Sequence, residues 1–242
     1  MTDIRLFDSP EDLAAGAALF FADIAEESLR KRGRFAVALA GGSTPEQAYG
    51  LLAEPPLRDR IDWTRTEVFF GDERAVPPDH AESNYCMASR TLLSKVPLPD
   101  ANIHRIEAER TDLEQAARDY ERILRETLGA TKVSPPRLDL ILLGIGRDGH
   151  TASIFPGSEE LARGPELVAH MLRTKTRDAR LTLTFPVLNA ARNVVFLVSG
   201  PAKAEIVSAV LEGHRGGDLL PPSRVMPEDG TLTFLLDRDA AP

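Results

Sequence analysis

The sequence predicts an α/β fold in which a largely parallel sheet is covered by helices on both faces. Three short, mainly apolar runs, at 35–40, 66–70 and 138–143, are interpreted as buried strands, because runs of this length are too short for core helices. Segments with apolar residues at helical spacing alternate with these runs, as they do in parallel sheets. Each run leads directly into a polar loop that contains glycine.

The helix signals come first along the chain. Ser9-Pro10-Glu11-Asp12 resembles a capping box, with Pro10 suited to the first helical position, and Gly33 is placed to end the helix. A second helix is expected to begin at Pro45. A third is predicted from Thr111 to Leu128, where apolar residues recur at helical spacing before a glycine.

The second half of the chain adds further strands at 180–185, 194–198 and 232–236, and a helix at 202–212. No internal repeat and no long linker interrupts this series, and the paired prolines mark loops. We therefore expect a single domain over residues 1–242.

The composition limits the class of protein. The chain has 29 Lys and Arg residues against 37 Asp and Glu, which gives a net charge of −8 with His neutral. This acidic balance disfavours nucleic acid and anionic membranes as partners. Cys86 is the only cysteine, so the chain can form neither an internal disulfide nor a four-cysteine zinc site. An acidic N-terminus unlike a secretory signal, and apolar runs all shorter than the roughly 18 residues of a membrane helix, predict a cytoplasmic enzyme or binding protein.

Three loops are candidate sites because ligands of open α/β sheets bind at the carboxyl ends of the strands. In the first, 41–45, two glycines, two hydroxyls and a helix start could cradle a phosphate, although a P-loop lysine is missing. An ordinary helix cap by Thr44, with Pro45 in the first turn, explains the same residues equally well.

A nucleophile elbow is a different interpretation of this loop. Residues 41–45 match the G-x-S-x-G pattern except that Pro45 replaces the final glycine, and Asp148 and His150 follow in the order of that family. The missing glycine disfavours a Ser43 hydrolase, because it permits the close packing that an elbow needs.

The third loop, 144–151, matches G-x-G-x-x-G, but prolines and glycines interrupt the helix that a dinucleotide site requires. Asp148 and His150 suit acid–base chemistry better. Together with Asp72, Glu73 and Arg74 at a neighbouring strand end, they favour a catalytic site.

The remaining histidines show no metal-ligand spacing, so we expect no metal. His80 and His214 are expected in surface loops, and His104 and His170 in strand-like runs.

These residues make the chain similar to the glucosamine-6-phosphate isomerase/6-phosphogluconolactonase family, and more to its lactonase branch. The resemblance runs from about residue 5 to the C-terminus. Five segments carry it in chain order: AGGSTP at 40–45, GDER at 71–74 with SNY at 83–85, GIGRDGHTAS at 144–153, RLTLT at 180–184 and GPAKA at 200–204.

The resemblance implies a Rossmann-like domain, no metal or other cofactor, and hydrolysis of 6-phospho-D-glucono-1,5-lactone to 6-phosphogluconate in the oxidative pentose phosphate pathway. The isomerase branch has an aromatic residue after Asp-Glu and a ring-opening Glu after the Gly-His segment. This chain has Arg74 and Ile154-Phe155 there, which favours the lactonase.

Lactone hydrolysis needs a base for water and positive charge near the carbonyl oxygen. We expect His150 to be the base, Asp148 or Asp72 to hold its tautomer, and Arg74 to face the lactone carbonyl or the sugar hydroxyls.

By the same resemblance, the phosphate is assigned to the glycine loop together with Arg180 and Lys203. The planar guanidinium of the arginine and the mobile charge of the lysine complement each other. These expected phosphate-binding residues are Gly41, Gly42, Ser43, Thr44, Arg180 and Lys203.

The expected partner is therefore a small sugar-phosphate lactone, bound by a monomer or weak homodimer. Two alternatives stay open at this point: a glucosamine-6-phosphate isomerase or deaminase, and a sugar-phosphate-binding protein without catalysis.

Overall fold

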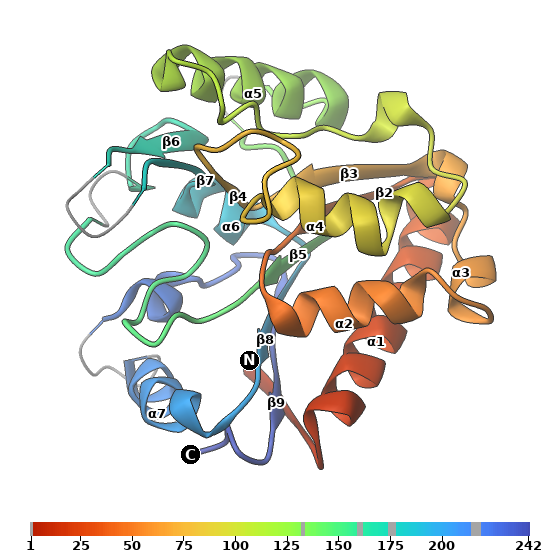
Figure 1. Cartoon of the computed structure of the whole chain (residues 1–242), viewed down its shortest axis with the longest axis vertical. Coiled ribbons are helices and arrows are strands. Elements are labelled where there is room, and N and C mark those ends of the chain that lie inside the picture. The colour runs from red at the N-terminus through yellow and green to blue at the C-terminus, as the bar shows by residue number, and fades with distance from the viewer. Residues whose placement is uncertain (1, 132–133, 159–161, 174–177, 214–218) are drawn as a thin grey trace.

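The structure is a computed structural model that describes residues 2–131, 134–158, 162–173, 178–213 and 219–242 (Figure 1). Its elements are β1 (Thr2–Phe7), α1 (Pro10–Arg32), β2 (Phe35–Leu39), α2 (Ser43–Leu52), α3 (Leu57–Arg60), β3 (Thr66–Phe70), β4 (Asp72–Arg74), α4 (Asn84–Thr91), α5 (Leu113–Leu128), β5 (Leu140–Leu143), β6 (Val168–Met171), β7 (Arg180–Leu183), α6 (Phe185–Ala190), β8 (Asn193–Val198), α7 (Ala204–Gly213) and β9 (Thr231–Asp237).

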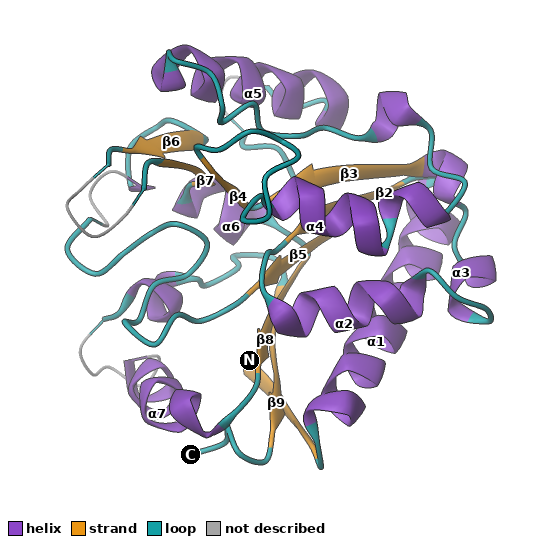
Figure 2. Cartoon of the chain, viewed as in Figure 1, coloured by secondary structure: helices purple, strands orange, loops and turns teal. Residues whose placement is uncertain are grey.

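A six-stranded sheet forms the centre, in the order β1-β9-β8-β5-β2-β3, and all its neighbouring strands are parallel. Figure 2 shows α1 and α2 on one side of this sheet and α6 and α7 on the other. The predicted α/β class with a mostly parallel sheet flanked by helices is confirmed. Along the chain, β2 leads to β3 on one side, whereas β5 leads to β8 on the other. The switch point of the sheet therefore lies between β2 and β5.

The signals at the helix ends act as expected. The Ser9 side chain accepts a hydrogen bond from the Asp12 amide at 3.1 Å, and Gly33 ends α1 in a left-handed conformation with φ of 73°. Every residue of β2 is buried, as its apolar sequence requires. The predicted strand at 66–70 is confirmed without a shift, and β5 begins at Leu140, two residues later than expected.

A second, three-stranded antiparallel sheet, in the order β4-β7-β6, was not foreseen. The expected strand at 180–185 ends at Leu183 and belongs to this small sheet, because Phe185 already begins α6. The expected helix at 202–212 is divided into a 3₁₀ turn, Pro201–Lys203, and α7. The small sheet brings β4 and β7 to the end of the large sheet at which β2 and β5 finish.

The opposite end of the sheet is held by a buried carboxylate. Asp139 accepts a hydrogen bond from the Ala36 amide at 2.9 Å and forms an ion pair with Arg32 at 2.8 Å. The amino ends of β2 and β5 are thereby joined, which leaves their carboxyl ends as the place for a site. No helix among the described residues is long and apolar enough to cross a membrane.

Candidate active site

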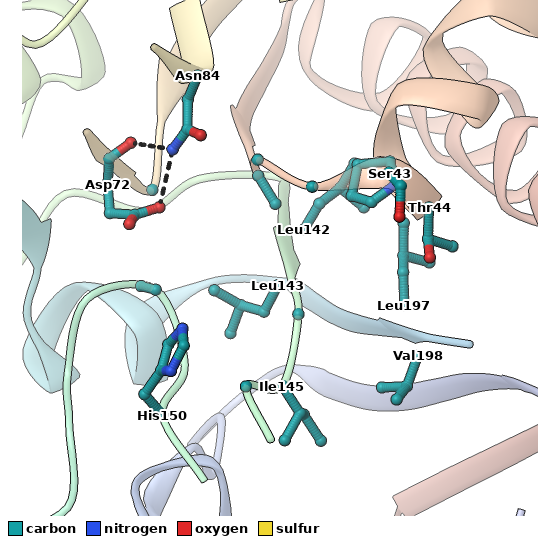
Figure 3. Close-up of a pocket in the computed structure, with 18 of the residues that line it drawn as sticks. Ser43, Thr44, Asp72, Asn84, Leu142, Leu143, Ile145, His150, Leu197 and Val198 are labelled. Carbon is teal, nitrogen blue, oxygen red and sulfur yellow. Dashed lines mark hydrogen bonds between the residues drawn. The ribbon is translucent and has the colours of Figure 1, made fainter. Parts of the chain in front are cut away.

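A pocket of about 280 Å³ lies at the switch point, between the carboxyl ends of the central strands and the small sheet (Figure 3). Of the ten site residues expected from the sequence, all but Asp148 line this pocket. The residues brought together are Gly41, Gly42, Ser43, Thr44, Asp72, Arg74, His150, Arg180 and Lys203.

His150, which lines the pocket, forms a pair with Asp148. Imidazole Nδ1 lies 2.5 Å from the Asp148 Oδ1 atom. Burial opposes ionisation of Asp148, but its hydrogen bond and charge interaction with His150 outweigh burial and hold the pKa of this carboxyl below its usual value. An ionised carboxylate at Nδ1 selects the tautomer with hydrogen on Nδ1, which keeps a lone pair on Nε2.

Loop 144–151 is organised by its own backbone. The Gly146 amide donates to the His150 carbonyl at 2.8 Å, and the Gly149 amide donates to the Gly146 carbonyl at 3.0 Å. A Cβ on Gly146 would lie 2.1 Å from His150 Nδ1 and 2.5 Å from Asp148 Oδ1. Gly146 therefore leaves the space in which the His150–Asp148 pair forms. A turn, not a helix, follows this loop, contrary to the dinucleotide interpretation.

Asp72 lies across the pocket and has other contacts. Its Oδ2 atom accepts from the Ser153 hydroxyl at 2.5 Å, and its Oδ1 atom accepts from the Asn84 amide at 3.2 Å (Figure 3). Arg180 Nη1 lies 3.9 Å from Oδ2. Of the two carboxylates expected to orient His150, the structure thus places Asp148 at the imidazole and Asp72 in a separate, buried network.

Glu73 is bonded to the same segments as Asp72, namely β4 and residues 83–85. Sequence reasoning noted Glu73 at this strand end without assigning it a role. It is 3% exposed and accepts four hydrogen bonds of 2.8 to 3.0 Å. Their donors are the amides of Arg74, Asn84 and Tyr85 and the hydroxyl of Ser83. Burial raises the pKa of Glu73, against these hydrogen bonds. The sequence signal that could have revealed these contacts is an acidic residue directly after Asp72, followed ten residues later by Ser83, which can cap a helix.

Asn84 joins the first loop to the Asp72 network. Its side chain also accepts from Arg74 Nη1 at 3.4 Å, while Arg74 donates to the Glu82 carbonyl at 2.5 Å. A Cβ on Gly41 would lie 1.9 Å from Asn84 Oδ1. The glycine at this position lets the loop after β2 lie against Asn84, and so fixes Arg74 beside the same loop.

Arg180 on β7 is the second arginine of the pocket. Its guanidinium carbon lies 5.8 Å from the centre of the Phe155 ring, and the His150 ring packs on the same phenyl group at 4.6 Å. Burial lowers the pKa of Arg180 despite nearby Asp72. Its buried Nε atom has no hydrogen-bond partner among the described residues, and a buried donor of this kind favours an incoming acceptor.

Lys203 reaches the pocket from the turn before α7. Its ammonium group donates to the Ile145 carbonyl at 2.5 Å. Burial lowers the pKa of Lys203, as does the positive charge of Arg147, while Asp148 acts in the opposite direction. The turn is held in place by Asp237, whose carboxylate accepts from the Gly200 amide at 3.0 Å.

The start of α2 forms the remaining wall. The residue that caps the start of α2 is Gly42, with φ of 106°. The interpretation of Thr44 as the helix cap is therefore wrong. Ser43 and Thr44 occupy the first turn and line the pocket, where free backbone N–H groups favour an anion. Figure 3 shows Ser43 on the side of the pocket opposite His150, which disagrees with a Ser43–His150 nucleophile pair.

No cluster of His, Cys, Asp or Glu side chains suited to a metal ion occurs in the described parts of the chain. His170 lies in β6, and His104 contacts Glu67 at 2.7 Å. The predicted surface position of His214 falls outside the described residues.

Comparisons with known proteins show which family the chain is similar to. The family model described as glucosamine-6-phosphate isomerases/6-phosphogluconolactonase matches residues 8–234. A rat protein named 6-phosphogluconolactonase is 40% identical over 241 residues, which cover 98% of this chain and 92% of the rat protein. A protein of Oryza sativa subsp. indica named probable 6-phosphogluconolactonase 2 is 36% identical, in an alignment that covers 99% of this chain and 89% of the rice protein.

Solved structures extend the similarity. The 6-phosphogluconolactonase from Trypanosoma brucei has a TM-score of 0.88 and 31% identity, with 99% of this chain and 97% of that chain covered. A monomeric glucosamine-6-phosphate deaminase, at 23% identity and a TM-score of 0.78, shares the fold. Since the family model matches residues 8–234 and the rat relative is similar over 92% of its length, the chain belongs to the family of glucosamine-6-phosphate isomerases and 6-phosphogluconolactonases.

Proposed function

We propose that this chain hydrolyses 6-phospho-D-glucono-1,5-lactone to 6-phospho-D-gluconate, the second step of the oxidative pentose phosphate pathway. The observation that carries the proposal is the His150–Asp148 pair, which faces the same pocket as Arg74, Arg180 and Lys203. Full-length relatives named 6-phosphogluconolactonase support the same activity.

In the proposed mechanism, His150 Nε2 takes a proton from water as the water oxygen attacks the lactone carbonyl carbon. The carbonyl oxygen gains negative charge, and Arg74 stabilises it or holds the neighbouring sugar hydroxyls. When the tetrahedral intermediate collapses, the bond from the carbonyl carbon to the ring oxygen breaks, and the imidazolium returns its proton to that oxygen. Asp148 keeps the imidazole oriented and stabilises its charged form during the cycle.

The phosphate group is assigned to the part of the pocket that the glycine loop, the start of α2, Lys203 and Arg180 line. The backbone of Gly42, the first turn of α2 and the side chain of Lys203 together offer N–H donors and a positive charge. Arg180, whose buried Nε atom is without a partner among the described residues, completes the proposed clamp. The acidic chain thus binds an anion through a local group of donors.

A stopped-time assay tests this function. Freshly generated 6-phosphogluconolactone should disappear faster with the protein than in its spontaneous hydrolysis, and a His150→Asn variant should remove the difference. Release of ammonia from glucosamine 6-phosphate without lactone turnover would instead favour the isomerase branch. Tight binding of phosphogluconate without turnover of either substrate would favour a binding protein.

A cytoplasmic location likewise stays a prediction. Some relatives carry a chloroplastic designation in their names, as in probable 6-phosphogluconolactonase 4 from rice. Fractionation of the source cells, followed with an antibody to this chain, tests the location directly.

A further inference from the structure

Strand β1 forms one of the two edges of the large sheet, and no strand among the described residues pairs with its free side. The pairing of β1 with β9 determines which backbone groups face outward. The Phe7 carbonyl accepts from the Arg238 amide, and in a parallel ladder the N–H and C=O groups of alternate residues point to the same neighbour. Thr2, Ile4 and Leu6 therefore direct their N–H and C=O groups away from β9.

The side chains of β1 also divide into two faces. Ile4 and Leu6 are 41% and 61% exposed, and their register partners on β9 are the buried Phe234 and Leu236. The apolar face of the sheet thus extends beyond β9 and ends in solvent. The charged residues of β1 lie on the other face, where Arg5 forms an exposed ion pair with Asp3 at 2.9 Å.

We propose that β1 pairs antiparallel with β1 of a second copy of this chain, about a two-fold axis that passes midway between the two Ile4 residues. The outward groups of Ile4 then bond to those of Ile4 in the second copy, and the outward groups of Thr2 bond to those of Leu6. Every outward N–H and C=O group of these three residues acquires a partner. The two six-stranded sheets join edge to edge, and Ile4 packs against its own symmetry mate.

The charges select this register. With the axis through Ile4, Asp3 of each copy lies opposite Arg5 of the other, so two attractive cross-strand pairs form. An axis through Asp3 or through Arg5 would place like charges opposite each other and would leave fewer outward groups paired. The ion pair within each strand is exposed, and exchanging it for the pair between strands therefore costs little.

The contact is small and lies away from the pocket, because no pocket-lining residue belongs to β1. A single strand pair buries less area than a stable dimer interface, so we expect a reversible dimer with a dissociation constant on the order of micromolar. Dimer formation and catalysis can then be measured independently, and failure of the proposed activity would leave this inference intact.

Sedimentation equilibrium of the untagged chain, from about 1 to 200 µM to span that constant, tests the proposal. Asp3→Arg should raise the dissociation constant at least about fivefold, because it replaces two attractive pairs with two repulsive ones. The double variant Asp3→Arg/Arg5→Asp restores opposite charges in the same register and should restore dimer formation. Asp59→Arg makes the same charge change at an exposed position in α3 and should have no effect.

A backbone variant gives a second readout. Ile4→Pro removes an outward N–H and spares the donors to β9, as proline does on edge strands, and it should abolish the dimer while thermal unfolding and circular dichroism show a folded chain. The proposal is overturned if the chain is monomeric throughout the concentration range. It is equally overturned if a dimer forms whose dissociation constant Asp3→Arg and Ile4→Pro leave unchanged.

Discussion

Two walls of the pocket are built in opposite ways. The His150 loop, residues 144–151, forms the His150–Asp148 pair from side chains two positions apart, and both stay partly exposed, at 29% and 47%. The Asp72 wall consists of β4 with residues 83–85 and Ser153. Its members come from distant segments, since Asp72 and Ser153 are 81 positions apart, and it is buried.

The difference teaches which wall supplies reactivity and which supplies rigidity. An exposed pair held by a short loop can change protonation and meet water at little cost to the fold. A buried carboxylate that accepts hydrogen bonds from several segments contributes to stability, because removing a donor leaves charge buried without a partner. Substitutions in the His150 loop should therefore reduce activity alone, and substitutions in the Asp72 wall should reduce both activity and stability.

The largest expected effect is that of His150→Asn. Loss of the proposed general base should lower kcat by roughly 10²- to 10⁴-fold, while the free energy of unfolding changes by less than about 0.5 kcal/mol. Initial rates with the lactone and urea unfolding measure the two quantities. A large loss of stability would contradict the proposed division between the walls.

Lys203→Ala should have the next largest effect. Loss of a charge-assisted contact to phosphate should raise KM by about 10- to 100-fold with a smaller change in kcat. Because burial lowers the pKa of Lys203, its positive charge disappears at a lower pH than that of a free lysine. Affinity of the wild type for 6-phosphogluconate, measured by calorimetry, should fall as pH rises through this pKa, and the Lys203→Ala variant should lack that alkaline decrease. Identical pH profiles would remove Lys203 from the clamp.

Gly146→Ala sharpens the test of the His150 loop. The added Cβ has no room beside the His150–Asp148 pair, so we expect kcat to fall about tenfold or more through displacement of the base. Thermal unfolding should change little. Gly50→Ala is the matched control, because a Cβ at Gly50 meets nothing within 4 Å, and it should retain normal kcat.

Ser153→Ala probes the Asp72 wall and should give the smallest change in rate. It removes the 2.5 Å hydrogen bond to Asp72 and should lower the free energy of unfolding by about 1–3 kcal/mol, with only a few-fold fall in kcat/KM. Ser94→Ala, at an exposed hydroxyl, controls for the loss of a serine. A normal melting temperature for Ser153→Ala would show that the wall does not stabilise the fold.

The same contrast explains what could be predicted from the sequence. The buried strands depend on local apolar runs and were recognisable. His150 and Asp148 lie in one turn, so Asp148 was recognisable as a candidate partner of His150, with Asp72 as the alternative. Asp72 was correctly expected at the pocket, but its contacts with Ser153 and Asn84 were not predictable, because they form only when the small sheet folds onto the large one. Glu73 was noted in the cluster at this strand end, but its contacts were not predictable for the same reason, since three of its four donors lie about ten residues further along the chain. The edge strand β1 has one exposed face and lacks the continuous apolar run by which the central strands were found.

The self-contained hydrogen bonding of the His150 loop has a consequence for how such enzymes change over evolutionary time. A short loop that brings its own backbone contacts and its own His–Asp pair can be exchanged as one piece at the end of a parallel strand. The Asp72 wall cannot be exchanged in this way, because Asp72, Asn84 and Ser153 must all be kept together. Residues 144–151 can thus be transferred as one segment, whereas the buried wall can be transferred only together with β4, residues 83–85 and Ser153.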